Sequence, residues 1–389
     1  MSIRFKVNFF ILLIFTPFVL QTSIADDIDQ SDQKALLGQQ LFFDTILSKN
    51  RTQSCSQCHN PNHGFIDNRD NGVNSMASLG DDGKSLGDRN APTLTYASFS
   101  PEFDFDSKNK DGWIGGQFYD GRQKNLMEQS GEPPLNPIEM AMESKAAVIE
   151  RLENSKSYNQ QFKSIYDEDI FLGVDDAYNA MKESIAEFEK TKQFSTFDSK
   201  YDRYLSGEYE LNDLEDLGRS LFFSNNNINC SNCHQLKAYE DAKGETFSNY
   251  EYHNIGVPIN SALRNENGMN SDFIDHGLLL NNFVVYNKHD GKMKVPTLRN
   301  VSITAPYMHN GVFQDLTTVI LFYDKYVNNE RLINPETGKP WREPEISETV
   351  NLKALREGKE LTERKIDALV AFLNILTDKR YEHLIPKQQ

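Results

Sequence analysis

The chain contains the string Cys55-Ser56-Gln57-Cys58-His59 and, further along, the string Cys230-Ser231-Asn232-Cys233-His234. All four cysteines of the 389 residues lie in these two strings. Cys-x-x-Cys-His is the attachment signature of c-type haem: the thiols add to the haem vinyl groups, and the histidine ligates the iron. A zinc half-site or a thioredoxin-like redox pair does not need this histidine in both copies. The sequence therefore predicts two covalently bound haems c.

The residues that precede each string repeat one pattern, Leu-Gly-x-x-Leu-Phe-Phe. It stands at residues 37–43 before the first string and at residues 217–223 before the second. The pattern is typical of an amphipathic helix that packs its leucine and phenylalanine face on a haem. We therefore expect a duplicated, mainly α fold with two cytochrome c-like domains, at 26–200 and 201–389, each wrapping one haem with long loops.

Apolar residues at helical spacing predict three further helices, over residues 141–154, 175–192 and 362–376. Residues 68–90 are rich in Gly, Asp, Asn and Ser, which predicts a long irregular segment after the first haem string. No sustained strand alternation is present in the sequence.

The N-terminus has the pattern of a secretory signal peptide. Arg4 and Lys6 precede an apolar run at 9–20, and Ser23-Ile24-Ala25 offers small residues for cleavage near Ala25. The run is too short for a spanning helix, so we expect no membrane insertion. Residues 1–25 are thus predicted to direct export, and a periplasm is the expected compartment because haem c is attached outside the cytoplasm.

The formal net charge is −16. Such an acidic balance argues against binding to nucleic acid and to anionic lipid. It suits a basic electron-transfer partner, although an acidic balance is also an ordinary solubility feature.

Several further strings resemble the bacterial di-haem cytochrome c peroxidases and their relatives, the MauG methylamine-utilisation proteins. The resemblance covers nearly all of the chain after the signal peptide. It rests on residues 89–94 (Arg-Asn-Ala-Pro-Thr-Leu), 117–122 (Gln-Phe-Tyr-Asp-Gly-Arg), 136–140 (Asn-Pro-Ile-Glu-Met), 295–300 (Val-Pro-Thr-Leu-Arg-Asn) and 305–311 (Ala-Pro-Tyr-Met-His-Asn-Gly).

The resemblance implies that the N-terminal haem is peroxidatic, with His59 as its iron ligand. Classical members carry a second histidine in the following loop that caps this iron, but the region around Ser75 has none here. His63 follows His59 too closely to reach the opposite face and is expected to be a polar loop residue. We therefore expect an open iron that binds hydrogen peroxide directly.

Glu139 and Gln129 match the family's distal glutamate and glutamine. A carboxylate can take a proton from one peroxide oxygen and return it to the other, and an amide can orient the substrate. Without the resemblance, both would be interpreted as solvated polar residues, with Glu139 at the start of a helix. Tyr119 stands where these enzymes usually have an interhaem tryptophan. It is either an electron-transfer residue or an aromatic packed between haem loops.

The resemblance places His234 on one side of the second haem. Classical peroxidases supply a methionine fourteen residues after the position of His309, where this chain has Tyr323, as in the MauG type. The candidates from the sequence itself are Met269, Met293 and Met308, and Tyr323 could also be only a core aromatic. The resemblance to the MauG type favours Tyr323 as the ligand. A phenolate ligand would stabilise ferric and high-valent iron, whereas a methionine would raise the potential.

A calcium ion commonly lies between the two domains of this family, held by an asparagine side chain and two backbone carbonyls. Asn90, Thr304 and Pro306 match these positions, and oxygen donors suit Ca²⁺. Taken without the resemblance, Asn90 would be a turn-forming side chain. His309 is expected near the same interface and the second haem.

The sequence thus favours an enzyme that reduces hydrogen peroxide to water at the first haem, with electrons passed through the second haem from a small cytochrome c or other redox protein. The alternative is a MauG-like enzyme that uses the oxidising equivalents to oxidise or mature a protein substrate. A third possibility, from a different class, is a non-catalytic di-haem electron carrier.

Overall fold

The computed structural model describes residues 29–108, 112–224, 228–239, 241–269 and 272–387. The predicted signal peptide, residues 1–25, lies outside the described residues. Within the described part, no helix has the length and apolar character needed to cross a membrane.

Most of the regular structure is helical. The first half of the chain forms α1 (Gln30–Phe43), α2 (Cys55–Cys58), α3 (Leu126–Ser130), α4 (Lys145–Asn154), α5 (Lys156–Ile165) and α6 (Val174–Glu189). The second half forms α7 (Lys200–Leu205), α8 (Asp213–Phe222), α9 (Ser261–Asn267), α10 (Leu316–Asp324), α11 (Leu352–Leu355) and α12 (Glu363–Asn374).

The strands of the described residues form short antiparallel pairs. They are β1 (Asp104–Phe105) with β2 (Trp113–Ile114), β3 (Tyr252–His253) with β4 (Met293–Lys294), and β5 (Ile333–Asn334) with β6 (Lys339–Pro340). The expectation of a mainly α protein with little sheet is confirmed.

The three further predicted helices are present, with shifted ends. The helix predicted from residue 141 begins only at Lys145, because Ala141 has a positive φ of 56° and the Ser144 side chain caps the first turn by accepting from the Ala147 N–H. The helix predicted over 175–192 is α6, which ends at Glu189, and the one predicted over 362–376 is α12. Residues 68–90 form the irregular segment that their composition predicts.

The repeated Leu-Gly-x-x-Leu-Phe-Phe pattern lies in equivalent helix crossings. In α1, a Cβ atom on Gly38 would lie 1.8 Å from the carbonyl oxygen of Ser184 in α6. In α8, a Cβ atom on Gly218 would lie 1.8 Å from the carbonyl oxygen of Ala368 in α12. Each glycine therefore lets the first helix of its half contact the backbone of a later helix.

Replacing Gly218 by alanine is expected to lower the free energy of unfolding by about 1–3 kcal/mol, because the added methyl group overpacks a backbone contact that cannot yield. Thermal unfolding of the haem-loaded protein measures the change. Ser220→Ala on the exposed side of α8 is the matched control and should leave the unfolding temperature nearly unchanged. Equal stability of the Gly218→Ala protein would contradict this account of the repeat.

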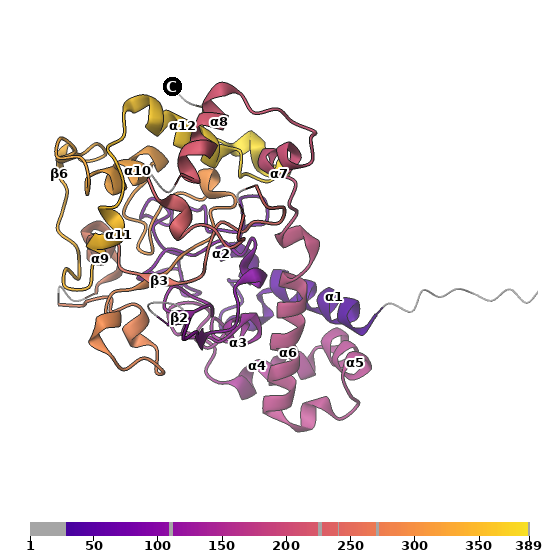
Figure 1. The fold of residues 1–389 in the computed structure, drawn as a ribbon. Coiled ribbons are helices and arrows are strands. Elements are labelled where there is room, and N and C mark those ends of the chain that lie inside the picture. Colours follow the sequence, from indigo (N-terminus) through magenta and orange to yellow (C-terminus); the bar gives the residue numbers. More distant parts are fainter. Residues whose placement is uncertain (1–28, 109–111, 225–227, 240, 270–271, 388–389) are drawn as a thin grey trace, which may run out of the picture.

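Two apolar cores lie at opposite ends of the molecule (Figure 1). The first is built within residues 37–185, around α1, α4, α5 and α6, and the second within residues 201–376, around α8, α10 and α12. Smaller clusters join the halves: Leu263 packs with Val73 and Met76, and Phe103 packs with Tyr252. Long loops carrying both haem strings fill the space between the two helical groups.

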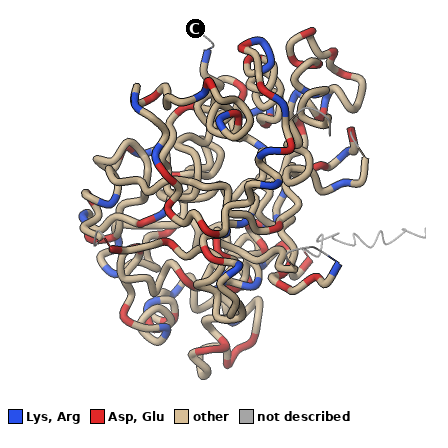
Figure 2. Tube along the Cα trace, turned by 60° about the vertical axis from the view of Figure 1, so that its left-hand side comes forward, with Lys and Arg blue, Asp and Glu red and all other residues tan. Residues whose placement is uncertain are grey.

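Charged residues are distributed over the whole trace, with acidic and basic positions interspersed (Figure 2). The excess of acidic residues in the composition is therefore spread over the chain.

Candidate functional site

A cavity of about 850 Å³ lies between the two helical groups, and both Cys-x-x-Cys-His strings line it. The volume is within the usual range for small-molecule and cofactor sites. The other predicted site residues that line it are Glu139, Gln129, Tyr119, Tyr323, Asn90, Thr304 and Pro306. The fold therefore brings together in one cavity the residues that the sequence favoured for the two haems and the calcium ion.

The first string is held by a short helix. Cys55 and Cys58 are the ends of α2, which begins with a capping box formed by Ser54 and Gln57. His59 follows directly, and its Nδ1 lies 3.1 Å from the carbonyl oxygen of Phe65. Because this contact engages Nδ1, Nε2 is the ring nitrogen available to a metal. Burial lowers the pKa of His59, which favours the neutral form that ligates iron.

The second string has the same arrangement. His234 Nδ1 lies 3.1 Å from the carbonyl oxygen of Phe247, and burial lowers the pKa of this imidazole to about 4. Its two cysteines are free thiols, as are those of the first string. Two free thiols and one neutral histidine with an available Nε2, repeated on one cavity, are the donor set that haem c requires. The residues present therefore fit two haems c.

Glu139 lies in a turn. It is not at the start of a helix, where the sequence would place it without the family resemblance. Asn136 Nδ2 donates a hydrogen bond to Glu139 Oε1 at 2.8 Å. Burial raises the pKa of the carboxyl group, although the nearby charge of Arg122 opposes this. Gln129 belongs to α3, and both side chains line the cavity. A carboxyl group whose pKa is raised by burial in a cavity is a candidate for proton exchange with a bound substrate.

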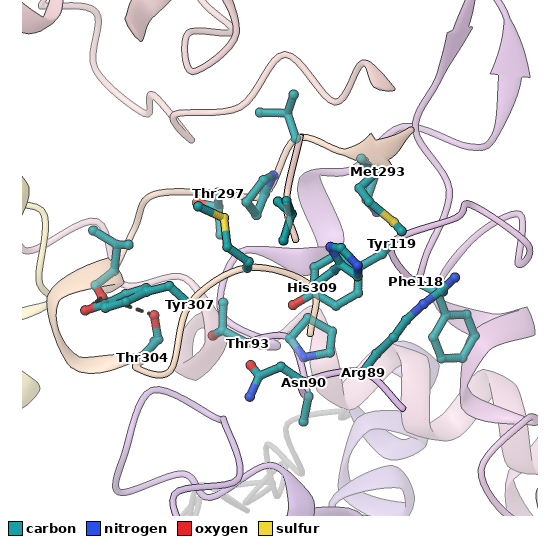
Figure 3. A pocket seen from close by; sticks show the side chains of 18 of the residues that line it. Arg89, Asn90, Thr93, Phe118, Tyr119, Met293, Thr297, Thr304, Tyr307 and His309 are labelled. Carbon is teal, nitrogen blue, oxygen red and sulfur yellow. Dashed lines mark hydrogen bonds between the residues drawn. The ribbon is translucent and has the colours of Figure 1, made fainter. Parts of the chain in front are cut away.

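Tyr119 is partly buried on the cavity wall. Its ring centroid lies 6.4 Å from that of the His309 imidazole, in an edge-on arrangement (Figure 3). Burial raises the pKa of the phenol, and the charge of Arg89 acts against this rise. Tyr119 is thus an oxidisable aromatic in the wall of the cavity that both strings share.

An ionic cluster next to Tyr119 was not predicted. Arg89 binds Asp120 at 2.7 Å and Asp275 at 2.7 Å, and Arg122 binds Asp120 at 3.1 Å. Burial alone would raise the pKa of Asp275, but its bonds to Arg89 lower it to about 2. Arg89 and Asp120 lie in two of the strings that carry the family resemblance, whereas nothing in the sequence around Asp275 marks it.

Tyr323 is presented to the cavity by α10. Burial raises the pKa of its phenol, and the nearby Cys233 and Cys230 sulfurs raise it further. The side chain is therefore close to the second haem string. Of the three methionine candidates, Met293 and Met308 line the cavity and Met269 does not. Met308 packs against an apolar cluster that includes Phe313 and Phe322.

His63 is not among the residues that line the cavity. Burial lowers its pKa, the charge of His383 lowers it further, and a hydrogen bond to the backbone of Ile303 opposes this. The position agrees with the expectation that His63 is a loop residue.

The three residues expected at a calcium site all line the shared cavity. Asn90 is buried, and its Nδ2 donates to the carbonyl of Ser75 at 3.1 Å, which leaves its Oδ1 as the oxygen donor. Its N–H donates to the carbonyl of His309 at 2.7 Å. Thr304 and Asn90 are both seen in Figure 3. One amide oxygen with main-chain carbonyls is chemically suited to Ca²⁺.

Comparisons with known proteins show the family to which the chain belongs. A family model described as di-haem cytochrome c peroxidase matches residues 32–210. The methylamine utilization protein MauG of Paracoccus denitrificans is 46% identical over 360 residues, which are 92% of this chain and 92% of that protein. The cytochrome c peroxidase Ccp of Escherichia coli is 30% identical over 92% of this chain and 60% of its own length.

Solved structures show the same relationship. The di-haem peroxidase BthA from Burkholderia thailandensis superposes with a TM-score of 0.81 at 27% identity, covering 91% of this chain and 88% of that one. A di-haem family implies haem c as the cofactor, in agreement with the two strings. The chain therefore belongs to the di-haem cytochrome c peroxidase and MauG family of oxidoreductases.

Proposed function

We propose that this protein is an exported di-haem c peroxidase that reduces hydrogen peroxide to water. The observation that carries the proposal is that the two haem strings share one cavity but have unequal surroundings. Glu139 and Gln129 line it, and the segment around Ser75 contains no histidine that could cap the first iron, whereas Tyr323 lies close to the cysteines of the second string. Residues 26–200 and 201–389 would be the two haem c domains, and residues 1–25 the export signal to a periplasm.

When bound at the first string, haem c would supply an iron that takes up the two oxidising equivalents of peroxide. The side chains on the cavity wall have three further roles. Glu139 accepts a proton from one peroxide oxygen and returns it to the departing oxygen, while Asn136 holds its Oε1 in place. Gln129 orients the peroxide by hydrogen bonds. Tyr119 would provide an aromatic path toward the second haem, which His234 and Tyr323 would hold.

An assay with reduced small cytochrome c tests the proposal. Addition of hydrogen peroxide should oxidise the cytochrome in the presence of the two-haem protein. A protein with both haems attached that reacts with peroxide but accepts no electrons from any small redox protein would contradict peroxidase function. Absence of any peroxide reaction would support the electron-carrier alternative.

A second candidate function is oxidation of a protein substrate. It is favoured by the higher identity to MauG, 46%, than to the peroxidase Ccp, 30%, and by Tyr323 near the second string. A phenolate ligand favours oxidised iron, so oxidising equivalents could be shared with the second haem and drawn from a bound protein. Peroxide-dependent oxidation of a partner protein, without turnover of reduced cytochrome c, would distinguish this function.

We further propose that Asn90, Thr304 and Pro306 hold one Ca²⁺ between the two halves. The proposal is supported by their place on the shared cavity and by the buried Asn90 amide. Metal analysis should find one calcium ion per chain in the wild type and less in Asn90→Ala. Equal calcium content in the two proteins would contradict the site.

A further inference from the structure

Lys294, in β4, is a partly buried lysine on the wall of the cavity. Its ammonium group donates hydrogen bonds to the carbonyl of Gly116 and, at 3.4 Å, to Ser100 Oγ. Its backbone N–H donates to the carbonyl of Tyr119 at 2.8 Å. The residue is therefore fixed beside the segment that carries Tyr119, on the cavity that both haem strings line.

The carboxylates around Lys294 are already bound by other cations. Asp120, whose charge acts on the ammonium group, is held by Arg89 at 2.7 Å and by Arg122 at 3.1 Å. Glu251 directly precedes β3, the strand that pairs with β4, and its carboxylate contacts His253 at 3.5 Å. Among the described residues, Lys294 thus has hydrogen-bond partners that are all neutral oxygens.

A buried ammonium group without a counter-charge is unfavourable. Burial accordingly lowers the pKa of Lys294 to about 7. The other lysine and arginine side chains on the cavity wall have either a carboxylate partner or contact with solvent. Arg89 and Arg122 have carboxylate partners, and Lys359 is exposed to solvent. Among the described residues on the cavity wall, Lys294 is therefore the partly buried lysine or arginine for which no carboxylate partner is found.

Haem c carries two propionate carboxylates, and the family implies two haems in this cavity. We propose that Lys294 binds a haem propionate at the junction of the two haem sites and keeps that propionate ionised. The inference rests on the proposed function only in requiring both haems to be attached. Lys294 would act as a positioning residue, since it would set the charge next to a haem without touching the peroxide.

The pairing has a consequence for the reduction potential of that haem. A positive charge beside the propionate favours the reduced iron, which carries one positive charge less. Without Lys294, the propionate would stand uncompensated at high pH and would take up a proton at lower pH, because desolvation raises the pKa of a carboxyl group. The potential would then fall as the pH rises, whereas with the pair intact it stays level.

The test is a spectroelectrochemical titration of both haems between about pH 6 and about pH 9, a range that spans the neutral region. The proteins are the wild type, Lys294→Gln and Lys294→Arg, each first shown by mass to carry two haems. In Lys294→Gln at the high-pH end, the ratio of reduced to oxidised haem at a fixed potential should fall roughly tenfold for one haem, about 59 mV for one electron. Lys294→Arg should follow the wild type.

Lys359→Gln is the matched control, because it removes the same charge from an exposed residue of the same cavity wall, where solvent and salt screen it. It should change the ratio less than about twofold. A Lys294→Gln protein with two haems and the wild-type potentials at every pH would overturn the inference and leave the proposed function intact.

The wild type gives an independent result should the glutamine variant fail to mature. A Lys294 without a propionate partner would lose its proton near neutral pH, since its pKa is about 7 in the protein alone. The potential of the nearby haem would then fall across this range in the wild type, and that slope would disappear in Lys294→Arg, which would overturn the inference. A level profile in both proteins supports the pair.

Discussion

Replacing Glu139 by glutamine is expected to lower kcat/KM for hydrogen peroxide by about 10²–10⁴-fold, while both haems remain attached. Glutamine keeps the size of the side chain and can still accept from Asn136 Nδ2, which bonds Glu139 Oε1 at 2.8 Å. It cannot take up and return a proton at peroxide oxygens. The variant therefore isolates proton transfer from the shape of the cavity.

Glu132→Gln is the matched control, because Glu132 is an exposed glutamate in the same segment, bonded to Gln123 at 2.7 Å. It should retain nearly full activity. Wild-type turnover by the Glu139→Gln protein would contradict the role of Glu139, whereas loss of haem in that protein would indicate a structural role.

The pH dependence of kcat/KM follows from the same carboxyl group. Proton acceptance requires the ionised form, and burial raises the pKa of Glu139 above the ordinary range for glutamate. The rate should therefore fall as the pH drops through this raised pKa and reach a plateau above it. The acid limb should be absent from the residual activity of Glu139→Gln. If the fall of kcat/KM at low pH persists unchanged in the variant, another titrating group is its cause.

Replacing Tyr323 by methionine is expected to raise the reduction potential of the second haem by several tenths of a volt, within the range of ~0.8 V that axial ligands cover. A phenolate is a hard anion that stabilises ferric iron, whereas a thioether favours the ferrous form. The variant should therefore store an electron more readily and take longer to be reoxidised. Redox titration followed by optical spectra measures the shift.

Tyr326→Phe is the control for this change. Tyr326 is a neighbouring aromatic whose hydroxyl donates to the carbonyl of Ile255 at 3.0 Å, and it does not line the cavity. Its loss should leave both potentials nearly unchanged. An unchanged second haem in Tyr323→Met would show that Tyr323 only packs, and Met293 or Met308 would then be the candidates on the cavity wall.

Much of the site could be predicted because its signals are local. The two haem strings are each five residues long, and the repeated glycines, Gly38 and Gly218, lie at fixed places before them. Their physical role became visible only with the partner helices, whose carbonyls at Ser184 and Ala368 are far along the chain. The apolar pattern predicts the start of α4 at residue 141, which is too early, because the pattern extends beyond the Ser144 cap where the helix begins.

Other parts of the site depend on contacts between distant residues. Arg89 and Asp275 are 186 positions apart, and only the fold shows that they form one cluster beside Tyr119. Nothing in the sequence distinguishes Lys294 from an exposed lysine, because its burial comes from contacts with the loops that carry Gly116 and Ser100. Pairing and desolvation of this kind are set by tertiary packing, which a single sequence does not report.

The central claim is that the two haems are unequal, one open for peroxide and one closed by Tyr323. Electron paramagnetic resonance and optical spectra of the fully oxidised wild type test it most directly. The account predicts one high-spin ferric haem, which is lost on addition of peroxide, and one low-spin ferric haem. Two low-spin haems that do not react with peroxide would contradict it.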